Sequence, residues 1–198
     1  MNKRTPVCLV LKSAVLLVTL LCVFPLFATN PQKKEMKELN VKKVSLANVA
    51  VENIPALLDK EKVAFQSINT VNWKAFPYQP EVQFRIAHAD DAILVHYKVK
   101  EASVRAVAAG DNGAVWEDAC VEFFSIPAGD GIYYNVECNC AGTLLIGAGA
   151  GRENREHAPQ EVMDKVQRWS SLGRQSFEER VGECNWELAL VIPYSAFF

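Results

Sequence analysis

The stretch Val115–Cys140, VWEDACVEFFSIPAGDGIYYNVECNC, decides the fold. It predicts two strands, Cys120–Ile126 and Tyr133–Cys140, which are joined by a turn of Pro, Gly and Asp residues at Pro127–Gly131. Side chains along a strand point alternately to its two faces, so each of these strands has one mostly apolar face and one mixed or polar face. The stretch therefore predicts a β-hairpin with one face toward a core.

The register of this hairpin follows from the same alternation. The apolar side chains that would face the core together are Val121, Phe123, Tyr134 and Val136. This pairing places Glu122 beside Asn135 and Glu137 on the opposite face. A slip of one residue would bury Asn135 and Glu137 in the core, so the pattern itself selects the register.

The predicted polar face has the chemistry that a sugar site needs. Carboxylates and amides form hydrogen bonds with hydroxyl groups, and an aromatic plane packs against a pyranose ring. Trp116 precedes the first strand, next to Glu117 and Asp118, which favours an exposed loop. The candidate carbohydrate-binding residues are Trp116, Glu122, Asn135 and Glu137.

The first 29 of the 198 residues have the pattern of a secretory signal peptide. Lys3, Arg4 and Lys12 precede the apolar run Ala14–Phe27, which is shorter than the roughly 20 residues of a membrane span. An uncleaved signal anchor is the alternative. We expect a signal peptide at 1–29, a Lys-rich linker at 30–43, one domain at 44–198, and a secreted or periplasmic protein.

The charge and the cysteine spacing argue against a nucleic-acid-binding protein and a zinc-binding protein. Without the three basic residues of the leader, 18 basic and 23 acidic residues remain, so the net charge of about −5 argues against nucleic acid as a partner. Cysteines in an oxidising compartment can form disulfides. However, the predicted register puts Cys120 and Cys138 on opposite faces, and we expect Cys120, Cys138, Cys140 and Cys184 to be mostly small buried residues. No cysteine spacing is typical of zinc.

The rest of the chain consists of short strand patterns with frequent turns, which predict an all-β antiparallel sandwich, jelly-roll-like, with short helical turns. The clearest hairpin joins Glu81–His88 to Ala92–Lys100. Further predictions are strands at Val44–Val51, Ser176–Val181 and Asn185–Ile192, a turn at Gly182-Glu183, and a short helix or turn at Ile54–Lys62. Three aromatic residues, Trp73, Phe76 and Tyr78, lie close together among turn residues. The chain ends on an apolar pair directly after a core strand, so we expect the domain to continue past Phe198.

The block WEDACVEFF at Trp116–Phe124 follows RIAH at Arg85–His88 and LVHY at Leu94–Tyr97. This arrangement resembles the family 9 carbohydrate-binding module, and it is most similar to secreted family 9-like proteins of polysaccharide-degrading bacteria. The similarity runs over roughly Val63–Tyr194 and also includes Trp73, YNVECN at Tyr134–Asn139 and Trp186-Glu187.

The resemblance implies a β-sandwich that clamps a sugar between two aromatic rings. Trp116 matches the first clamp residue and Glu122 an acid that accepts hydrogen bonds from the sugar, while Asn135 stands where the family can have an Arg. The second clamp residue would lie beyond Phe198. The resemblance further implies structural calcium, for which the candidate loop carboxylates are Asp90, Asp91, Asp111 and Asp118, and no organic cofactor. The implied partners are poly- or oligosaccharides, alongside glycoside hydrolases that break down polysaccharide.

Three other hypotheses stay open at this point. Glu122 and Glu137 could be the carboxylate pair of a glycoside hydrolase acting on O-glycosyl bonds. A haem could be held by His88, His96 or His157 with Met163 or Met36. A structural surface domain without a ligand is the third.

Overall fold

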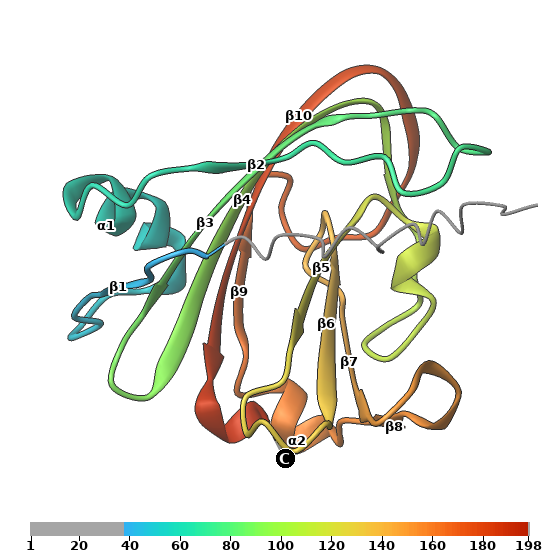
Figure 1. Cartoon of the computed structure of the whole chain (residues 1–198). Coiled ribbons are helices and arrows are strands. Elements are labelled where there is room, and N and C mark those ends of the chain that lie inside the picture. Colours follow the sequence, from blue (N-terminus) through green and yellow to red (C-terminus); the bar gives the residue numbers. More distant parts are fainter. Residues whose placement is uncertain (1–37, 198) are drawn as a thin grey trace, which may run out of the picture. The chain divides into compact units, whose positions relative to one another are not determined.

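The structure is a computed structural model, described here for residues 38–197. Two β-sheets face each other across an apolar core (Figure 1). The predicted signal peptide and the first residues of the predicted linker lie outside the described residues. Within the described part of the chain, no helix is long and apolar enough to cross a membrane.

The larger sheet has six strands, in the order β1-β3-β4-β10-β9, and β2 also pairs with β3. β1 runs parallel to β3, and the other pairs are antiparallel. The strands are β1 (Lys42–Lys43), β2 (Gln66–Ile68), β3 (Glu81–His88), β4 (Ala92–Ala106), β9 (Gln167–Ser170) and β10 (Phe177–Pro193).

The smaller sheet has four antiparallel strands in chain order. They are β5 (Cys120–Ser125), β6 (Tyr133–Asn139), β7 (Leu144–Gly149) and β8 (Glu156–His157). The helical elements are short: α1 (Ile54–Lys60), α2 (Gln160–Met163) and the 3-10 turns η1 (Val51–Asn53), η2 (Val115–Glu117), η3 (Arg152–Asn154) and η4 (Tyr194–Ala196). The predicted all-β antiparallel sandwich is confirmed.

Both predicted hairpins have the register that alternation indicates. In β3–β4, Phe84 pairs with Tyr97, and both side chains pack in or against the core. In β5–β6, Phe123 pairs with Val136 on the core side, and Glu122 pairs with Glu137 on the opposite face. The same register separates the cysteines, and Cys120, Cys138, Cys140 and Cys184 are all free thiols.

The six-stranded sheet is buried on both faces at one end. The main core fills the space between the sheets with side chains such as Tyr97, Val136 and Leu188. A second apolar cluster lies on the other side of the larger sheet, where Ile54 and Leu58 of α1 pack with Leu94, Ala189 and Val191. The helix predicted at Ile54–Lys62 therefore covers the outer face of this sheet.

Two strand predictions were wrong. Val44–Val51 forms no strand, because the chain turns at Asn48, whose φ is 58°; the preceding Lys42–Lys43, expected in the linker, pairs with β3 instead. The expected turn at Gly182-Glu183 does not separate two strands either. β10 continues through it, because the register shift between Val181 and Cys184 takes up the extra residues and Gly182 adopts a φ of 127°.

Candidate ligand-binding site

The outer face of the smaller sheet brings together three of the four predicted site residues. Glu122 on β5 lies opposite Glu137 on β6, and Asn135 is two residues before Glu137 on the same face. Asn135 and Glu137 are only 1% and 4% exposed, whereas Glu122 is exposed at the edge strand. The side-chain amide of Asn135 donates a hydrogen bond to Oε1 of Glu137. The predicted group of carboxylates and an amide is therefore present.

Arg155 joins this group, and sequence reasoning missed it. Gly147 pairs with Asn135 in the neighbouring strand β7, so it lies on the same outer face. Because it has no side chain, Arg155 passes over it; a Cβ at Gly147 would lie 3.4 Å from Arg155 Cδ. This path brings Arg155 Nη1 to 3.8 Å from Glu137 Oε1. The run GAGAG at Gly147–Gly151 was the available signal, because glycines in a strand allow a close approach of another segment.

Glu137 affects the protonation of Glu122. Partial desolvation of the Glu122 carboxyl group raises its pKa, although the residue as a whole is exposed, and the negative charge of Glu137 raises it further. Burial also raises the pKa of Glu137, while Arg155 and the Asn135 amide act in the opposite direction. The face therefore combines acidic groups with a cation and an amide at close range.

Two hydrogen-bond acceptors on this face lack a partner. Among the described residues, the buried side-chain polar atoms without a hydrogen bond are Asn112 Oδ1, Ser125 Oγ, Asn135 Oδ1 and Glu137 Oε2. An unsatisfied buried polar group costs about 1–3 kcal/mol. Asn135 Oδ1 and Glu137 Oε2 belong to neighbouring residues of one strand face. Asn135 Oδ1 is an acceptor, and so is Glu137 Oε2 when the carboxylate is ionised, so the group that would satisfy them is a donor, such as a hydroxyl.

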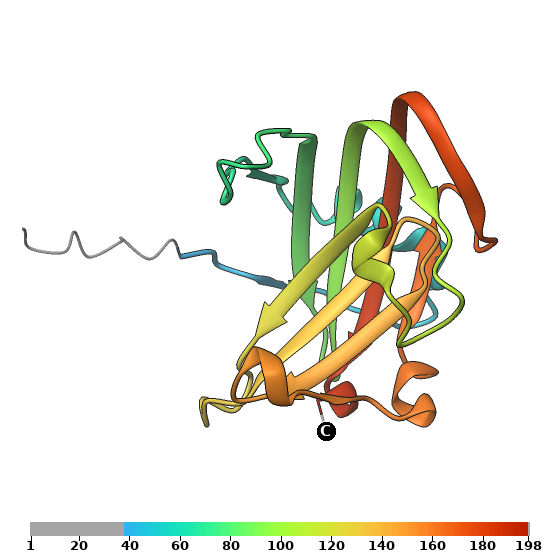
Figure 2. The same ribbon diagram turned by 90° about the vertical axis from the view of Figure 1, so that its right-hand side faces the viewer.

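The fourth predicted residue, Trp116, lies on η2, which contacts β5 and β6 (Figure 2, yellow-green turn over the upper end of these strands). Its side chain is 56% exposed. The chain around it is held from both sides. Arg105 donates to the Glu117 carbonyl, and the Asp118 carboxylate accepts the backbone N–H groups of Val107 and Ala108, each at 3.0 Å. The exposed ring is thus carried by a well-bonded segment.

Three of the four candidate calcium carboxylates have other side-chain or backbone partners, and Asp91 is the fourth. Asp90 pairs with Lys43, Asp111 pairs with Arg168 at 2.7 Å, and Asp118 binds the two backbone amides just described. Among residues 38–197, no group of three or more His, Cys, Asp or Glu side chains is arranged to hold a metal ion. Structural calcium, which the family resemblance implies, stays a prediction.

His96 is the most deeply buried histidine of the haem hypothesis, and both of its ring nitrogens have partners. His96 is fully buried, its Nδ1 accepts a hydrogen bond from Arg85, and its Nε2 lies 2.8 Å from a Glu187 oxygen. Met163 is buried in the main core. Met36 lies outside the described residues.

A β-sandwich with a carboxylate and amide face and an exposed tryptophan has the surface chemistry that carbohydrate-binding domains use. Comparison with known families agrees: the family described as carbohydrate-binding family 9 matches residues 52–198, and the chain belongs to this family. The resemblance inferred from Trp116–Phe124 is therefore confirmed.

A solved structure is also closely similar. It is the crystal structure of a "putative carbohydrate-binding protein" from Bacteroides uniformis ATCC 8492, with 63% sequence identity and a TM-score of 0.78. The match covers 81% of this chain and 74% of that chain. No curated protein matches the chain significantly.

Proposed function

We propose that this protein is a secreted, non-catalytic, carbohydrate-binding module-like protein that binds poly- or oligosaccharide and so supports polysaccharide breakdown. Membership of carbohydrate-binding family 9 supports a saccharide ligand. The predicted signal peptide supports export, and glycoside hydrolases are the proposed partners.

The observation that carries this proposal is the pair of unpartnered acceptors on the polar face, Asn135 Oδ1 and Glu137 Oε2. Sugar hydroxyls donate hydrogen bonds and would satisfy both atoms once the Arg155 side chain moves aside. Glu122, which is already exposed, offers a further acceptor. The exposed Trp116 ring supplies an apolar plane for stacking, worth roughly 1 kcal/mol by analogy with aromatic pairs.

The burial of Glu137, and not its distance from Glu122, favours binding over glycoside hydrolysis. Glu122 and Glu137 project from adjacent strands to the same face, and a retaining glycosidase also has its two carboxyl groups about 5 Å apart. Glu137 is also buried and already accepts a hydrogen bond from Asn135.

Calorimetric titration with xylo-, cello- and manno-oligosaccharides tests the proposal. We expect binding that Trp116→Ala weakens about fivefold, without a change in the thermal midpoint, because the ring is exposed. Leu39→Ala removes an exposed apolar side chain in the segment before β1 and is the matched control.

Two results would contradict the proposal. One is a folded protein that gives no heat with any of the three sugars, or that binds equally well after Trp116→Ala. The other is release of reducing sugar that Glu122→Gln abolishes, which would favour the hydrolase. The same titrations with added calcium or a chelator test the calcium that the family resemblance implies.

A further inference from the structure

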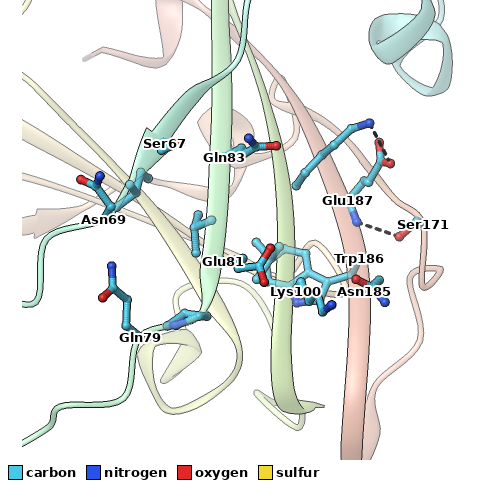
Figure 3. A pocket seen from close by; sticks show the side chains of 15 residues that line it. Ser67, Asn69, Gln79, Glu81, Gln83, Lys100, Ser171, Asn185, Trp186 and Glu187 are labelled. Carbon is cyan, nitrogen blue, oxygen red and sulfur yellow. Dashed lines mark hydrogen bonds and ion pairs between the residues drawn. The ribbon is translucent and has the colours of Figure 1, made fainter.

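A pocket lies on the outer face of the six-stranded sheet, over β3, β4 and β10 (Figure 3). Its volume of about 680 Å³ lies within the roughly 300–1,000 Å³ of small-molecule sites. It shares no residue with the face that carries Glu122 and Glu137. We call it the β4 groove, because β4 runs along its floor.

The floor of the β4 groove consists of two cross-strand rows of polar side chains. The register aligns Gln83, Lys98 and Glu187 in one row and Glu81, Lys100 and Asn185 in the next. The residues between these rows, Val82, Val99 and Trp186, belong to the core side. Alternation therefore directs all six polar side chains to the same outer face.

The charges of this floor largely compensate one another. Lys98 Nζ lies 3.4 Å from a Glu187 oxygen, and Lys100 Nζ lies 3.1 Å from a Glu183 oxygen. With both lysines paired and Glu81 nearby, the groove offers no excess of positive charge to an anion. Amides, ammonium groups and carboxylates provide donors and acceptors side by side, which suits hydroxyl groups because these both donate and accept.

The floor is held in place from the side of α1, by the next row of side chains on the same face. His96 Nε2 lies 2.8 Å from Glu187 Oε2, and Arg85 Nε donates to His96 Nδ1 at 3.1 Å. Arg85 in turn pairs with Asp59 of α1 at 2.6 Å. The Phe65 ring covers Arg85 and Lys98, at 4.4 and 5.1 Å from its centroid. A row fixed in this way loses little conformational freedom when a ligand binds.

An aromatic loop adjoins the groove. Residues 69–80 connect β2 to β3, and Asn69, Gln79 and Pro80 of this loop line the groove. The loop exposes Trp73, Phe76 and Tyr78, which are 70%, 74% and 59% accessible. The backbone N–H of Ala102 donates to the Tyr78 hydroxyl at 2.7 Å, and this fixes the end of the loop to β4. Grouped exposed aromatics mark an interaction surface more often than single ones do.

We propose that the β4 groove and the aromatic loop form a second saccharide-binding site, for a neutral, polyhydroxylated chain. Gln83, Lys98 and Asn185 hydrogen-bond its hydroxyls, and Tyr78, with Trp73 and Phe76 further along the loop, offers rings for stacking. The site is independent of the one at Trp116, since the two lie on different sheets. Each chain thus has two places for sugar.

The experiment titrates the whole protein with xylo-, cello- and mannohexaose and compares stoichiometry in four proteins. These are the wild type, Trp116→Ala, the double variant Gln83→Ala/Asn185→Ala, and the combination of all three substitutions. Gln83 and Asn185 are exposed, so the fold should tolerate both changes. Gln160→Ala, an exposed amide on α2, is the matched control.

We expect two sugars bound per wild-type chain, with one of the two binding components weakened in Trp116→Ala and the other in the double variant. The groove component should weaken about tenfold in the double variant, since each lost neutral hydrogen bond contributes a factor of a few. One sugar per chain that Trp116→Ala removes would overturn the groove site and leave the proposed function. One sugar that only the groove variant removes would support the groove and contradict the assignment of Trp116. A protein that binds none of the hexaoses would overturn both.

Discussion

Among the individual residues of the candidate site, Glu137 is the buried acid. The residue is 4% exposed, and burial raises its pKa above the ordinary 4.5. An acid whose pKa is higher in the folded state than in the unfolded state stabilises the fold when it is protonated. That contribution is fully present below pH 4.5 and is lost as the pH rises through the folded-state pKa.

We therefore predict that Glu137→Gln stabilises the protein at pH 7 by about 1 kcal/mol, because glutamine fills the same space and accepts the Asn135 hydrogen bond without a buried charge. The difference in unfolding free energy between Glu137→Gln and the wild type should decrease toward zero as the pH falls to 4. Thermal unfolding across pH 4–8 measures it, with Glu153→Gln on the exposed η3 as the control. A destabilised variant, or a difference that is constant with pH, would contradict this account.

At this scale the sequence predicted part of the site. Alternation along two short strands placed Glu122, Asn135 and Glu137 on one face, because period and polarity agree there. Arg155 could not be found in that way. It reaches Glu137 only through the fold of the segment after β7 and the space above Gly147, and neither is a local property of the sequence.

Among the elements, β7 determines how closely the segment after it can lie over the site. A Cβ at Gly149 would lie 2.8 Å from the Asn154 carbonyl oxygen, whereas a Cβ at Gly151 would have no atom within 4 Å. We predict that Gly149→Ala lowers the unfolding free energy by about 1–3 kcal/mol and shifts Arg155 away from Glu137. Gly151→Ala is the matched control and should be nearly neutral.

Denaturant unfolding measures the stability of both glycine variants, and sugar titration measures their affinity. If Gly149→Ala is as stable as Gly151→Ala and binds sugar like the wild type, the close contact between Gly149 and Asn154 contributes neither to stability nor to sugar binding.

The elements also show where sequence patterns mislead. The hairpin of β3 and β4 was predicted because both strands alternate cleanly around a short turn. β10 was divided in two, because Gly182-Glu183 has the composition of a turn; the same freedom of glycine allows a bulge within one continuous strand. A choice between a turn and a bulge depends on the partner strand, here β4, and not on the residues themselves.

For the molecule as a whole, a chain of contacts through Asp59, Arg85, His96 and Glu187, of which Arg85 and His96 are buried, links α1 to the larger sheet. Burial lowers the pKa of His96 to about 4, and Arg85 contributes to the decrease, although Glu187 opposes it. A histidine whose folded-state pKa lies below its unfolded value of 6.5 stabilises the fold above pH 6.5. That stability is lost as the pH falls toward 4.

We predict that the unfolding free energy of the wild type falls by up to about 3 kcal/mol relative to His96→Gln between pH 6.5 and 4. Chemical unfolding of both proteins over this range measures the difference, and the acidic groups common to both cancel. If His96→Gln does not fold, NMR titration of the imidazole in the wild type measures the pKa directly. An imidazole that titrates near 6.5 would contradict the prediction.

The two apolar clusters on either side of the larger sheet have a consequence for how the molecule opens. The cluster of Ile54, Leu58 and Leu94 has its own side chains and is separated from the main core by a single layer of strands. Units of this kind can unfold locally with less free energy than the whole domain. Backbone amide hydrogens of α1 should thus exchange with deuterium earlier than those of the central half of β10, through transient detachment of the helix from an otherwise closed sandwich.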